Sequence, residues 1–247
     1  MSRFAGVGVL VTGASRGLGS VIAEAFGSEG AHVGITYRFH GSEAQAVLDR
    51  IRERGGSGTC LEMDVRDADS VRAAVAAFEE ERPMDVLVNN AGVVQDQPLM
   101  MLSPDAWQKI MDTNLTGTYH ACRAVLPAMM ARRRGAIVNV SSVSALRAVP
   151  GQAAYAASKA GILALTRTLA KEVCDHGVRV NAVIPGLLST GMGVRMDRRM
   201  AERHRADIPM GRFGSGEEAA GAVLFLASDD AAYVVGESII VDGGMTL

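Results

Sequence analysis

Tyr155 and Lys159 are the two side chains of this sequence best placed for acid–base chemistry. Four residues separate them, so on a helix they share one face and both head groups reach the same ligand. A free tyrosine has a pKa of about 10, and a nearby ammonium lowers that pKa by favouring the phenolate. Ser142 lies upstream, where its hydroxyl could hydrogen-bond the same substrate oxygen. The group suits proton transfer to or from a carbonyl or alcohol oxygen, although a Tyr-x-x-x-Lys pair alone is more often a solvated helix face.

The sparing use of lysine singles out Lys159. Three of the 25 Lys and Arg residues are lysines, the others being Lys109 and Lys171. Arginine cannot replace a compact ammonium that must lie close to a phenol and a sugar hydroxyl. The choice of lysine at this position therefore favours the chemical interpretation.

A glycine-rich string at 12–19, Thr-Gly-Ala-Ser-Arg-Gly-Leu-Gly, follows the first strand-like run and opens the first helical one. Glycines at such a turn let the backbone approach a pyrophosphate, and the helix N-terminus offers N–H donors to it. The position of the string makes this a dinucleotide site. The spacing does not fit the GxxxxGK[ST] loop of a nucleoside triphosphatase.

The end of the second strand indicates which dinucleotide is bound. An NAD site usually presents Asp or Glu there to the ribose hydroxyls. Here the strand ends in Thr36, Tyr37 and Arg38, without an acid. Arg38 and Arg16 could meet a 2′-phosphate, which favours NADP(H); the alternative is that one or both arginines are simply solvated.

Short apolar runs alternate with helical patterns, which predicts an α/β fold: a Rossmann-type, doubly wound parallel sheet of about seven strands with helices on both faces. The expected strands are 7–12, 32–37, 58–64, 85–89, 136–141, 178–184 and 237–241. The expected helices are 17–29, 42–54, 67–82, 103–133 and 153–176, with starts at Asp67 and Ser103-Pro104.

Nothing divides the chain, so residues 1–247 are expected to form a single dinucleotide-binding domain. The segment Gly191–Phe213, rich in Met and Arg, is longer than an ordinary connection. It is interpreted as a helical excursion that serves as a substrate lid. The alternative is an amphipathic surface helix.

Composition bounds the remaining classes. The 247 residues are 48% hydrophobic and 21% charged with a net charge of −2, so no general attraction to nucleic acid or anionic membrane is expected. Three cysteines without CxxC spacing argue against both a disulfide framework and a zinc site, and no metal is expected. The sequence shows no signal peptide and no membrane span, so a cytoplasmic protein is expected.

The motifs together resemble the short-chain dehydrogenase/reductase family. The matching positions are TGASRGLG (12–19), Asp64-Val65, NNAG (89–92), Asn114, Ser142, Tyr155 with Lys159, and Pro185-Gly186 followed by Thr190. Within that family the chain looks most like the 3-oxoacyl-[acyl-carrier-protein] reductases. The strings that carry this likeness are 93–107, 129–142, 150–173 and VDGGM at 241–245.

The resemblance implies catalytic roles. Tyr155 would donate the proton to the substrate carbonyl oxygen as hydride leaves the nicotinamide, and Ser142 would hydrogen-bond that oxygen. Lys159 would hold the nicotinamide ribose and lower the pKa of Tyr155. Asn114 would hold a water that joins Lys159 to a proton relay; without the resemblance it is equally well a capping or helix-kinking asparagine.

The resemblance also implies the residues that bind NADP(H). Asp64 and Val65 would contact adenine, Asn90, Ala91 and Gly92 would line the adenosine ribose, and Leu188 and Thr190 would meet the carboxamide. The complete expected set is Gly13, Ser15, Arg16, Gly17, Leu18, Gly19, Tyr37, Arg38, Asp64, Val65, Asn90, Ala91, Gly92, Tyr155, Lys159, Pro185, Gly186, Leu188 and Thr190.

Partners are implied in the same way. Carrier docking in such reductases uses basic residues; Arg132, Arg133 and Arg134 fit one patch, while His176 stands at the second basic position. Met100, Met101 and Met192 could line an acyl cleft or serve as ordinary packing. A homotetramer is expected, with helices 103–133 and 153–176 meeting their symmetry mates through Gly117, Ala121, Ala160, Gly161 and Ala164.

The leading interpretation is NADPH-dependent reduction of a carrier-bound 3-oxoacyl thioester to the 3-hydroxyacyl thioester, as in fatty acid or polyketide/polyene biosynthesis. One alternative is an oxidoreductase of the same fold that acts on another small ketone or alcohol. A remote alternative is a non-catalytic dinucleotide-binding module. The presence of Asn114, Ser142, Tyr155 and Lys159 together argues against it.

Overall fold

The centre of the protein is a parallel sheet of seven strands, seen in a computed structural model that describes residues 2–190 and 198–247. The strand order is β3-β2-β1-β4-β5-β6-β7, so the direction of winding reverses between β1 and β4. This is the predicted doubly wound sheet, whose ligands bind outside the carboxyl ends of the strands at the reversal. The strands are β1 (Gly8–Val11), β2 (His32–Tyr37), β3 (Ser57–Glu62), β4 (Met84–Asn89), β5 (Gly135–Val140), β6 (Val178–Pro185) and β7 (Ser238–Val241).

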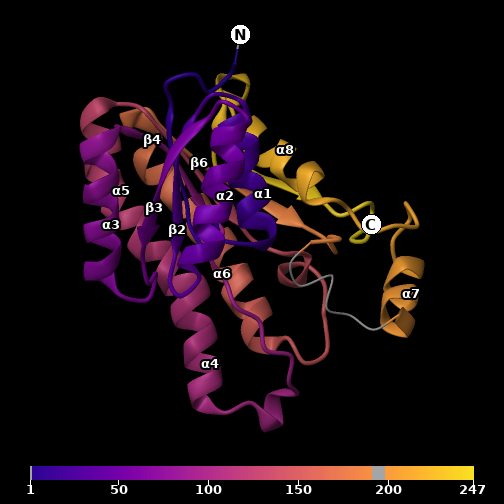
Figure 1. Ribbon diagram of the computed structural model, residues 1–247. Coiled ribbons are helices and arrows are strands. Elements are labelled where there is room, and N and C mark those ends of the chain that lie inside the picture. Colours follow the sequence, from indigo (N-terminus) through magenta and orange to yellow (C-terminus); the bar gives the residue numbers. More distant parts are fainter. Residues whose placement is uncertain (1, 191–197) are drawn as a thin grey trace.

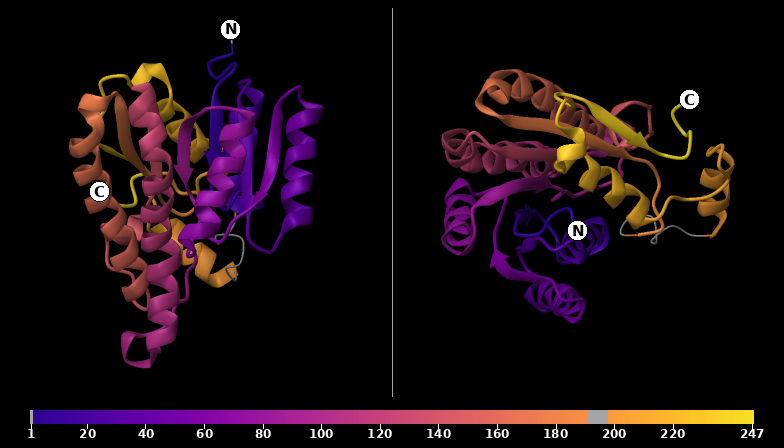
Figure 2. Two further views of the ribbon diagram at one scale, coloured as in Figure 1. Left: turned by 90° about the vertical axis from the view of Figure 1, so that its left-hand side faces the viewer. Right: turned by 90° about the horizontal axis from the view of Figure 1, so that it is seen from above.

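Helices cover both faces of the sheet (Figures 1 and 2). One apolar core lies between the sheet and α1, α2 and α8; the other lies between the sheet and α3, α5 and α6. Val9 and Val11 of β1 belong to the first core and Leu10 to the second, because successive strand residues point to opposite faces. These helices are α1 (Gly17–Ser28), α2 (Gly41–Glu53), α3 (Ala68–Glu81), α5 (Gly117–Arg132), α6 (Ala153–Val173) and α8 (Gly216–Ala227).

The helix predicted over 103–133 is divided in three. It consists of α4 (Pro104–Met111), the π-helical turn η2 (Asp112–Thr116) and α5. The N–H of Gly117 donates to the carbonyl of Asp112, five residues back, which widens the helix for one turn. The apolar periodicity continues through the turn and does not reveal it. The turn contains Asn114, one of the expected site residues.

Two other helices modify the expectations. The helix predicted over 153–176 ends as α6 at Val173 and continues as the 3-10 turn η4 (Cys174–His176). Helix α8 was not predicted, although a capping box precedes it: Ser215 Oγ accepts from the Glu218 N–H, and the Glu218 carboxylate accepts from the Ser215 N–H.

The excursion after β6 contains a helix, α7 (Arg198–Ala206), as expected; residues 191–197 lie outside the described part. After α7 the chain returns to the body at Ile208, which is buried, and the N–H of Met210 donates to the Gly243 carbonyl. Arg147 lies 3.8 Å from Asp207 and also bonds the Met245 carbonyl. Within the described residues, no helix has the length and apolarity needed to cross a membrane.

Candidate active site

The glycine-rich loop joins β1 to α1 at the carboxyl edge of the sheet, where β1 meets β4. Gly13 and Gly17 adopt left-handed backbone angles, φ +63° and +62°, which glycine tolerates without strain. A Cβ on Gly13 would lie 3.0 Å from Ala91 Cα, and one on Gly19 would overlap Asn90 Nδ2. Glycine is therefore required at both positions by close packing of the loop against the segment after β4.

Hydrogen bonds hold this loop against its neighbours. Thr12 Oγ1 accepts from the N–H groups of Asn90 and Ala91, both at 2.9 Å. Asn90 Nδ2 returns a bond to the Thr12 carbonyl, and Thr36 Oγ1 of β2 accepts from the Gly13 N–H at 3.1 Å. Asn90, the second asparagine of NNAG, thus holds the glycine-rich loop in place through these hydrogen bonds.

The start of α1 fits a dinucleotide phosphate. Arg16 is the N-cap, and in the described part of the chain its side chain makes no capping bond to the first turn. The first turn, Gly17-Leu18-Gly19-Ser20, contains no acid. Uncapped N–H groups at a helix N-terminus attract an anion, and small residues leave room for it. Ser15, beside them in the loop, is buried.

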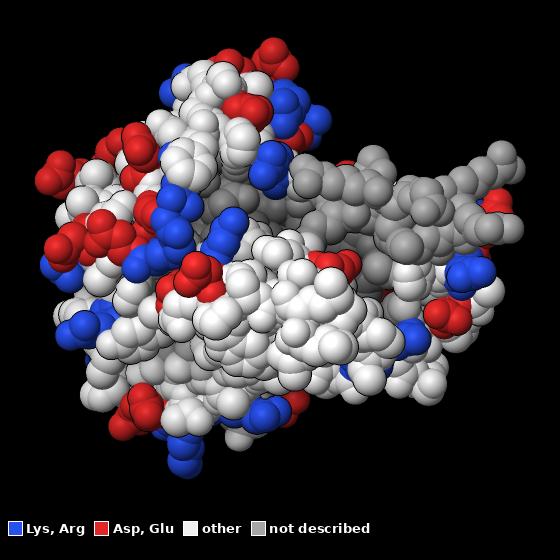
Figure 3. All heavy atoms as spheres, turned by 90° about the horizontal axis from the view of Figure 1, so that it is seen from below, with Lys and Arg blue, Asp and Glu red and all other residues white. Residues whose placement is uncertain are grey.

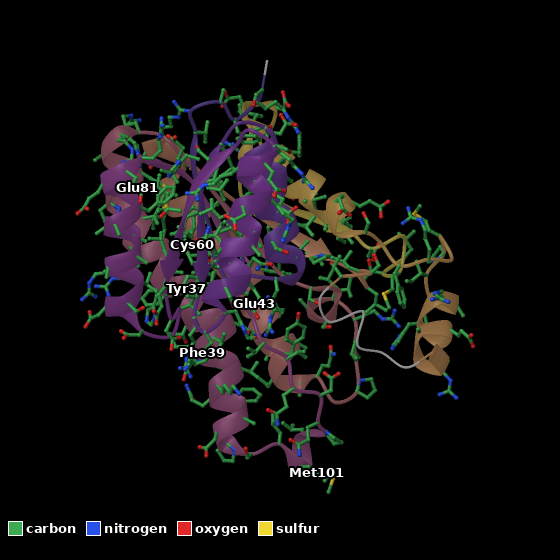
Figure 4. All side chains as sticks on the ribbon, in the orientation of Figure 1. Tyr37, Phe39, Glu43, Cys60, Glu81 and Met101 are labelled. Atoms are coloured by element: carbon green, nitrogen blue, oxygen red, sulfur yellow. The ribbon has the colours of Figure 1, made fainter. Side chains whose placement is uncertain are left out.

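The expected 2′-phosphate corner is a cluster of three charges. Arg38 Nε lies 2.9 Å from Asp64 Oδ2, and Arg66 Nη2 donates to the same oxygen at 2.7 Å. The Arg38 guanidinium also stacks 4.1 Å over the Phe39 ring. Figure 4 labels Tyr37 and Phe39 at the lower, carboxyl end of β2. Arg38 is therefore held at this edge by Asp64 rather than merely solvated.

Charge pairing also fixes the state of Asp64. Its hydrogen bonds with Arg66 hold the pKa of the Asp64 carboxyl below its usual value, with a smaller contribution from Arg38. Figure 3, which looks at this edge from below, shows Lys and Arg side chains gathered beside acidic ones. A carboxylate between two guanidiniums positions both as phosphate or sugar ligands.

Val65, between Asp64 and Arg66 in the sequence, packs against α5. A Cβ on Gly117 would lie 2.8 Å from Val65 Cγ2, so α5 approaches Val65 as closely as a glycine allows. His120 Nδ1 lies 3.1 Å from the Val65 carbonyl oxygen. Residues of α5 thus fix the position of Val65.

Tyr155 and Lys159 lie one turn apart on α6, and both are buried, at 7% and 4% exposure. Lys159 Nζ is 5.7 Å from the centre of the Tyr155 ring and donates to the Val140 carbonyl at 2.8 Å. Ser141 Oγ donates to the Lys159 carbonyl, which ties the end of β5 to α6. The chain therefore brings Tyr155, Lys159 and Ser142 together.

Burial shifts both pKa values away from what the sequence suggested. Desolvation raises the pKa of Tyr155, and a hydrogen bond with the Ser142 side chain opposes that rise. Desolvation lowers the pKa of Lys159 to about 8. The expected depression of the Tyr155 pKa by Lys159 is not what this structure shows, because the low-polarity surroundings disfavour each charged form.

Asn114 is buried in the π-helical turn and clamps the segment after β4. Its Oδ1 accepts from the Val93 N–H at 2.8 Å, and its Nδ2 donates to the Val93 carbonyl and to Ser158 Oγ, both at 3.0 Å. A Cβ on Gly92 would lie 3.3 Å from Asn114 Oδ1 and 3.5 Å from Lys159 Nζ. Asn114 Oδ1 and Lys159 Nζ thus both lie next to Gly92.

The end of β6 completes the edge. A Cβ on Gly186 would lie 2.7 Å from Asp242 Cβ, so the chain after Pro185 passes close to the turn after β7. Leu188 is buried and pairs with Gly214 in a short bridge. The hydroxyl oxygen of Thr190 is buried and has no hydrogen-bond partner among the described residues. An unpaired hydroxyl at this edge fits the polar carboxamide of a nicotinamide.

The arginines expected to dock a carrier lie elsewhere. Arg132 ends α5 and Arg133 and Arg134 precede β5, so they are at the opposite end of that strand from Ser142, roughly 20 Å away. Arg132 bonds Glu79 through two nitrogens, and Arg134 pairs with Asp85 at 3.3 Å. They do not border the site of their own chain, because a strand separates them from it.

Two further expectations are changed by exposure and packing. Met100 and Met101 are 93% and 64% exposed in the 3-10 turn η1 (Leu99–Met101), where Figure 4 labels Met101; Met192 lies outside the described residues. Of the small residues expected between subunits, Gly117 packs on Val65, Ala121 is buried and Gly161 packs on Leu115. Ala160 and Ala164 remain exposed on α6.

Several positioning groups were not foreseen. Ser158 accepts from Asn114 and donates to the Tyr155 carbonyl at 2.7 Å; its place just before Lys159 was the available signal. Arg66 follows the expected Asp64-Val65 pair by one residue. The Val140 and Val93 backbone groups carry no sequence signal, because any residue offers the same N–H and C=O.

A doubly wound parallel sheet with a glycine-rich first turn and buried Tyr, Lys and Asn at its carboxyl edge defines a dinucleotide-binding α/β protein. The family profile described as enoyl-(acyl carrier protein) reductase matches residues 13–246. The 3-oxoacyl-[acyl-carrier-protein] reductase FabG of Staphylococcus aureus is 40% identical over 237 residues, which cover 96% of each chain. The chain therefore belongs to the short-chain dehydrogenase/reductase family, and it is an oxidoreductase that acts on CH–OH and C=O groups with NAD(P)(H).

Solved structures agree on the fold. The 3-oxoacyl-[acyl-carrier protein] reductase of Brucella melitensis superposes with a TM-score of 0.95 at 33% identity, covering 100% of this chain and 93% of that one. A protein of Agrobacterium tumefaciens, provisionally assigned as a gluconate dehydrogenase, also gives 0.95 at 33% identity, with coverage of 98% and 97%. The backbone alone therefore does not select the substrate.

Proposed function

We propose that this protein reduces a 3-oxoacyl thioester, carried by an acyl carrier protein, to the 3-hydroxyacyl thioester with NADPH. The observation that carries the proposal is the pair of buried side chains Tyr155 and Lys159, with the half-buried Ser142 bonded to Tyr155, beside the glycine-rich loop. The relatives at about 40% identity, named as 3-oxoacyl-[acyl-carrier-protein] reductases, supply the substrate class.

The side chains would divide the work at one substrate oxygen. The dinucleotide, when bound, supplies the hydride. Tyr155 keeps its proton at neutral pH, because burial raises its pKa, and it gives that proton to the carbonyl oxygen as negative charge develops there. The Ser142 hydroxyl hydrogen-bonds the same oxygen and orients the ketone.

Lys159 and Asn114 would act behind Tyr155. The Lys159 ammonium holds a ribose hydroxyl and stabilises the phenolate that forms once Tyr155 has lost its proton. Asn114 holds the backbone of Val93, and Gly92, the residue before it, has no side chain to crowd the Lys159 amine. The proposed path by which Tyr155 regains its proton runs from solvent through a water held at Asn114 and through the Lys159 ammonium.

The side chains at the ends of β2 and β3 support NADPH rather than NADH as the proposed cofactor. Arg38 and Arg66 share Asp64, and β2 ends without an acid. Two guanidiniums against one carboxylate leave a net positive charge for a 2′-phosphate, which Arg38 and Arg16 would contact.

One assay tests the proposal. Purified protein is mixed with NADPH and either acetoacetyl-CoA or acetoacetyl-carrier protein, and the loss of NADPH absorbance is followed. We expect reduction of both thioesters with a higher kcat/KM for the carrier-bound one. Reduction of a simple ketone with NADPH, or oxidation of a simple alcohol or sugar with NADP⁺, but reduction of neither thioester would favour the second candidate. That candidate acts on another small ketone or alcohol, and the similarity to the Agrobacterium structure supports it.

The carrier and the oligomer are linked proposals. Arg132–Arg134 lie away from the site of their own chain, so a carrier docked on them would deliver its acyl group to another copy in the assembly. A groove between α5 and α6, lined by Tyr119, Leu126, Met130 and Leu165 among others, offers an apolar face for that copy. We propose a homotetramer built partly on this face, with light scattering as its test.

The excursion after β6 is proposed to cover the substrate side of the site. Its returning segment is fastened to the body through Ile208, Arg147 and Gly243. The exposed residues of α7, including Arg203 and Arg205, leave that helix a basic outer surface.

A further inference from the structure

A line of hydrogen bonds leads from Ser142 to the surface. Ser142 Oγ donates to Ser144 Oγ at 3.3 Å, Ser144 Oγ donates to Gln152 Oε1 at 2.7 Å, and Gln152 Nε2 donates to Asp96 Oδ1 at 2.9 Å. Four side chains from three segments take part: the loop after β4, the 3-10 turn η3 (Val143–Ala145) with its N-cap, and the N-cap of α6.

The carboxylate at the outer end sets the direction of every bond in the line. Asp96 can only accept, so the Gln152 amide must turn its Nε2 to Asp96 and its Oε1 to Ser144. The Ser144 hydroxyl must then donate to Oε1, which leaves its lone pairs facing Ser142. The Ser144 N–H also donates to Ser142 Oγ, at 3.2 Å.

These bonds hold Ser142 Oγ in place and leave its proton available to another acceptor. The Ser144 N–H fixes the position of Ser142 Oγ, and the bond from Ser142 to Ser144, at 3.3 Å, is longer than an ordinary O–H···O bond. The Ser142 hydroxyl can therefore turn to a substrate oxygen without losing a strong bond.

Backbone contacts hold the loop that carries Asp96 in place against the start of α6. The Gln97 N–H donates to the Gly151 carbonyl at 2.9 Å, which joins the Asp96 loop to the start of α6. Gly151 adopts φ +88°, a left-handed angle that favours glycine. Two residues later α6 begins, and Tyr155 lies in its first turn.

We propose that Asp96, acting through Gln152 and Ser144, orients the Ser142 hydroxyl for the substrate carbonyl, so that Asp96 and Ser144 are positioning residues. The proposal rests on the proposed reduction, in which Ser142 bonds the substrate oxygen. Charge adds a second effect. Among the described residues, the Lys159 ammonium lies 5.7 Å from the centre of the Tyr155 ring, and the Asp96 carboxylate raises the pKa of Tyr155 by disfavouring a second negative charge.

The first test is a kinetic cycle with NADPH and acetoacetyl-CoA on the wild type, Asp96→Ala, which removes the acceptor of the Gln152 amide, Ser144→Ala and the double variant. We expect each single change to lower kcat about tenfold, the rate equivalent of one hydrogen bond of ordinary strength, with the KM for NADPH unchanged. The double variant should lose no more than the worse single variant, because the residues act as one line. Asp105→Asn, an exposed acid in the first turn of α4, is the matched control and should match the wild type.

The second test needs no substrate. Phenolate absorbance is titrated in each protein and in its Tyr155→Phe counterpart, so that the difference reports Tyr155 alone. Asp96→Ala should move this titration to lower pH, and Asp105→Asn should not. Losses that multiply in the double variant, or singles within twofold of the wild type, would overturn the positioning role; an unmoved titration would overturn the charge effect. If the wild type reduces no thioester, the reduction proposal fails, and the titration still decides whether Asp96 acts on Tyr155.

Discussion

At the β2–β3 end of the active edge, Arg38, Asp64 and Arg66 meet as ion pairs whose side chains remain 40%, 24% and 33% exposed. At the β5–α6 end, Lys159 is buried, and its ammonium donates to one backbone carbonyl. Water screens the first group, so its members keep their charges at little cost. Desolvation acts on the second group, so its pKa values move. The open corner is suited to choosing a ligand, and the buried centre is suited to moving a proton.

The largest effect is expected at the buried centre. Tyr155→Phe should lower kcat by about 10²–10⁴-fold, because the ring stays and the proton donor goes. NADPH binding, measured by fluorescence titration, should stay within a few-fold of wild type. Tyr233→Phe, at a fully exposed tyrosine, is the control and should change neither quantity. Turnover of the Tyr155 variant close to wild type would show that the proton comes from elsewhere.

Burial of Lys159 should make the free energy of unfolding depend on pH. Its pKa falls from 10.5 in the unfolded chain to about 8 in the folded one, so between these values the unfolded state binds more protons. The contribution of Lys159 to the free energy of unfolding therefore rises with pH across this window and is constant below it. Denaturant melts of wild type and Lys159→Met, compared at both ends of the window, should diverge in favour of wild type at the upper end. Lys171→Met, an exposed lysine on the same helix, should track wild type; equal slopes for all three proteins would contradict the burial of a charged Lys159.

Gly19→Ala tests the packing of the glycine-rich loop against Asn90, which lies between the β2–β3 end and the β5–α6 end of the active edge. The added methyl would overlap Asn90 Nδ2 and lie 2.6 Å from the Gly13 carbonyl oxygen. Overpacking of this kind costs about 1–3 kcal/mol, so unfolding should occur at lower denaturant and NADPH should bind more weakly. Gly221→Ala, in α8, is the matched control: a Cβ there meets nothing within 4 Å. Because alanine is the better helix former, that variant should be stabilised by about 0.5–1 kcal/mol.

The smallest change in rate is expected at the exposed β2–β3 end of the active edge, where a substitution should mainly change the selectivity between NADPH and NADH. Arg38→Asp removes a phosphate partner and adds repulsion, so the ratio of kcat/KM for NADPH over NADH should fall about tenfold or more. Tm should fall little, because the pair with Asp64 is exposed. Arg72→Asp, at another exposed arginine, is the control. Equal use of both nucleotides by the unmutated protein would remove the basis for the NADP(H) assignment.

Much of this molecule was predictable from local patterns. Runs such as Val9–Val11 and Val86–Asn89 are apolar without alternation, which is typical of strands buried on both faces, and they fixed the parallel sheet. The glycines at 13, 17 and 19 indicated the phosphate turn, because only glycine allows those angles and contacts. Tyr155 and Lys159 were recognisable because one helical turn brings them to a single face.

Other features depended on contacts between segments distant in sequence. Asn114, in the π-helical turn, accepts from the Val93 N–H and donates to Ser158 Oγ, 21 and 44 positions away in the sequence. The raised pKa of Tyr155 results from burial, which spacing cannot report. Asp96 reaches Ser142 across 46 positions of sequence through Gln152 and Ser144. The sequence by itself determined which elements form and which residue types stand at their ends. Only the tertiary structure decided which charges are desolvated and which hydroxyls meet, because these depend on the distances between elements that folding brings together.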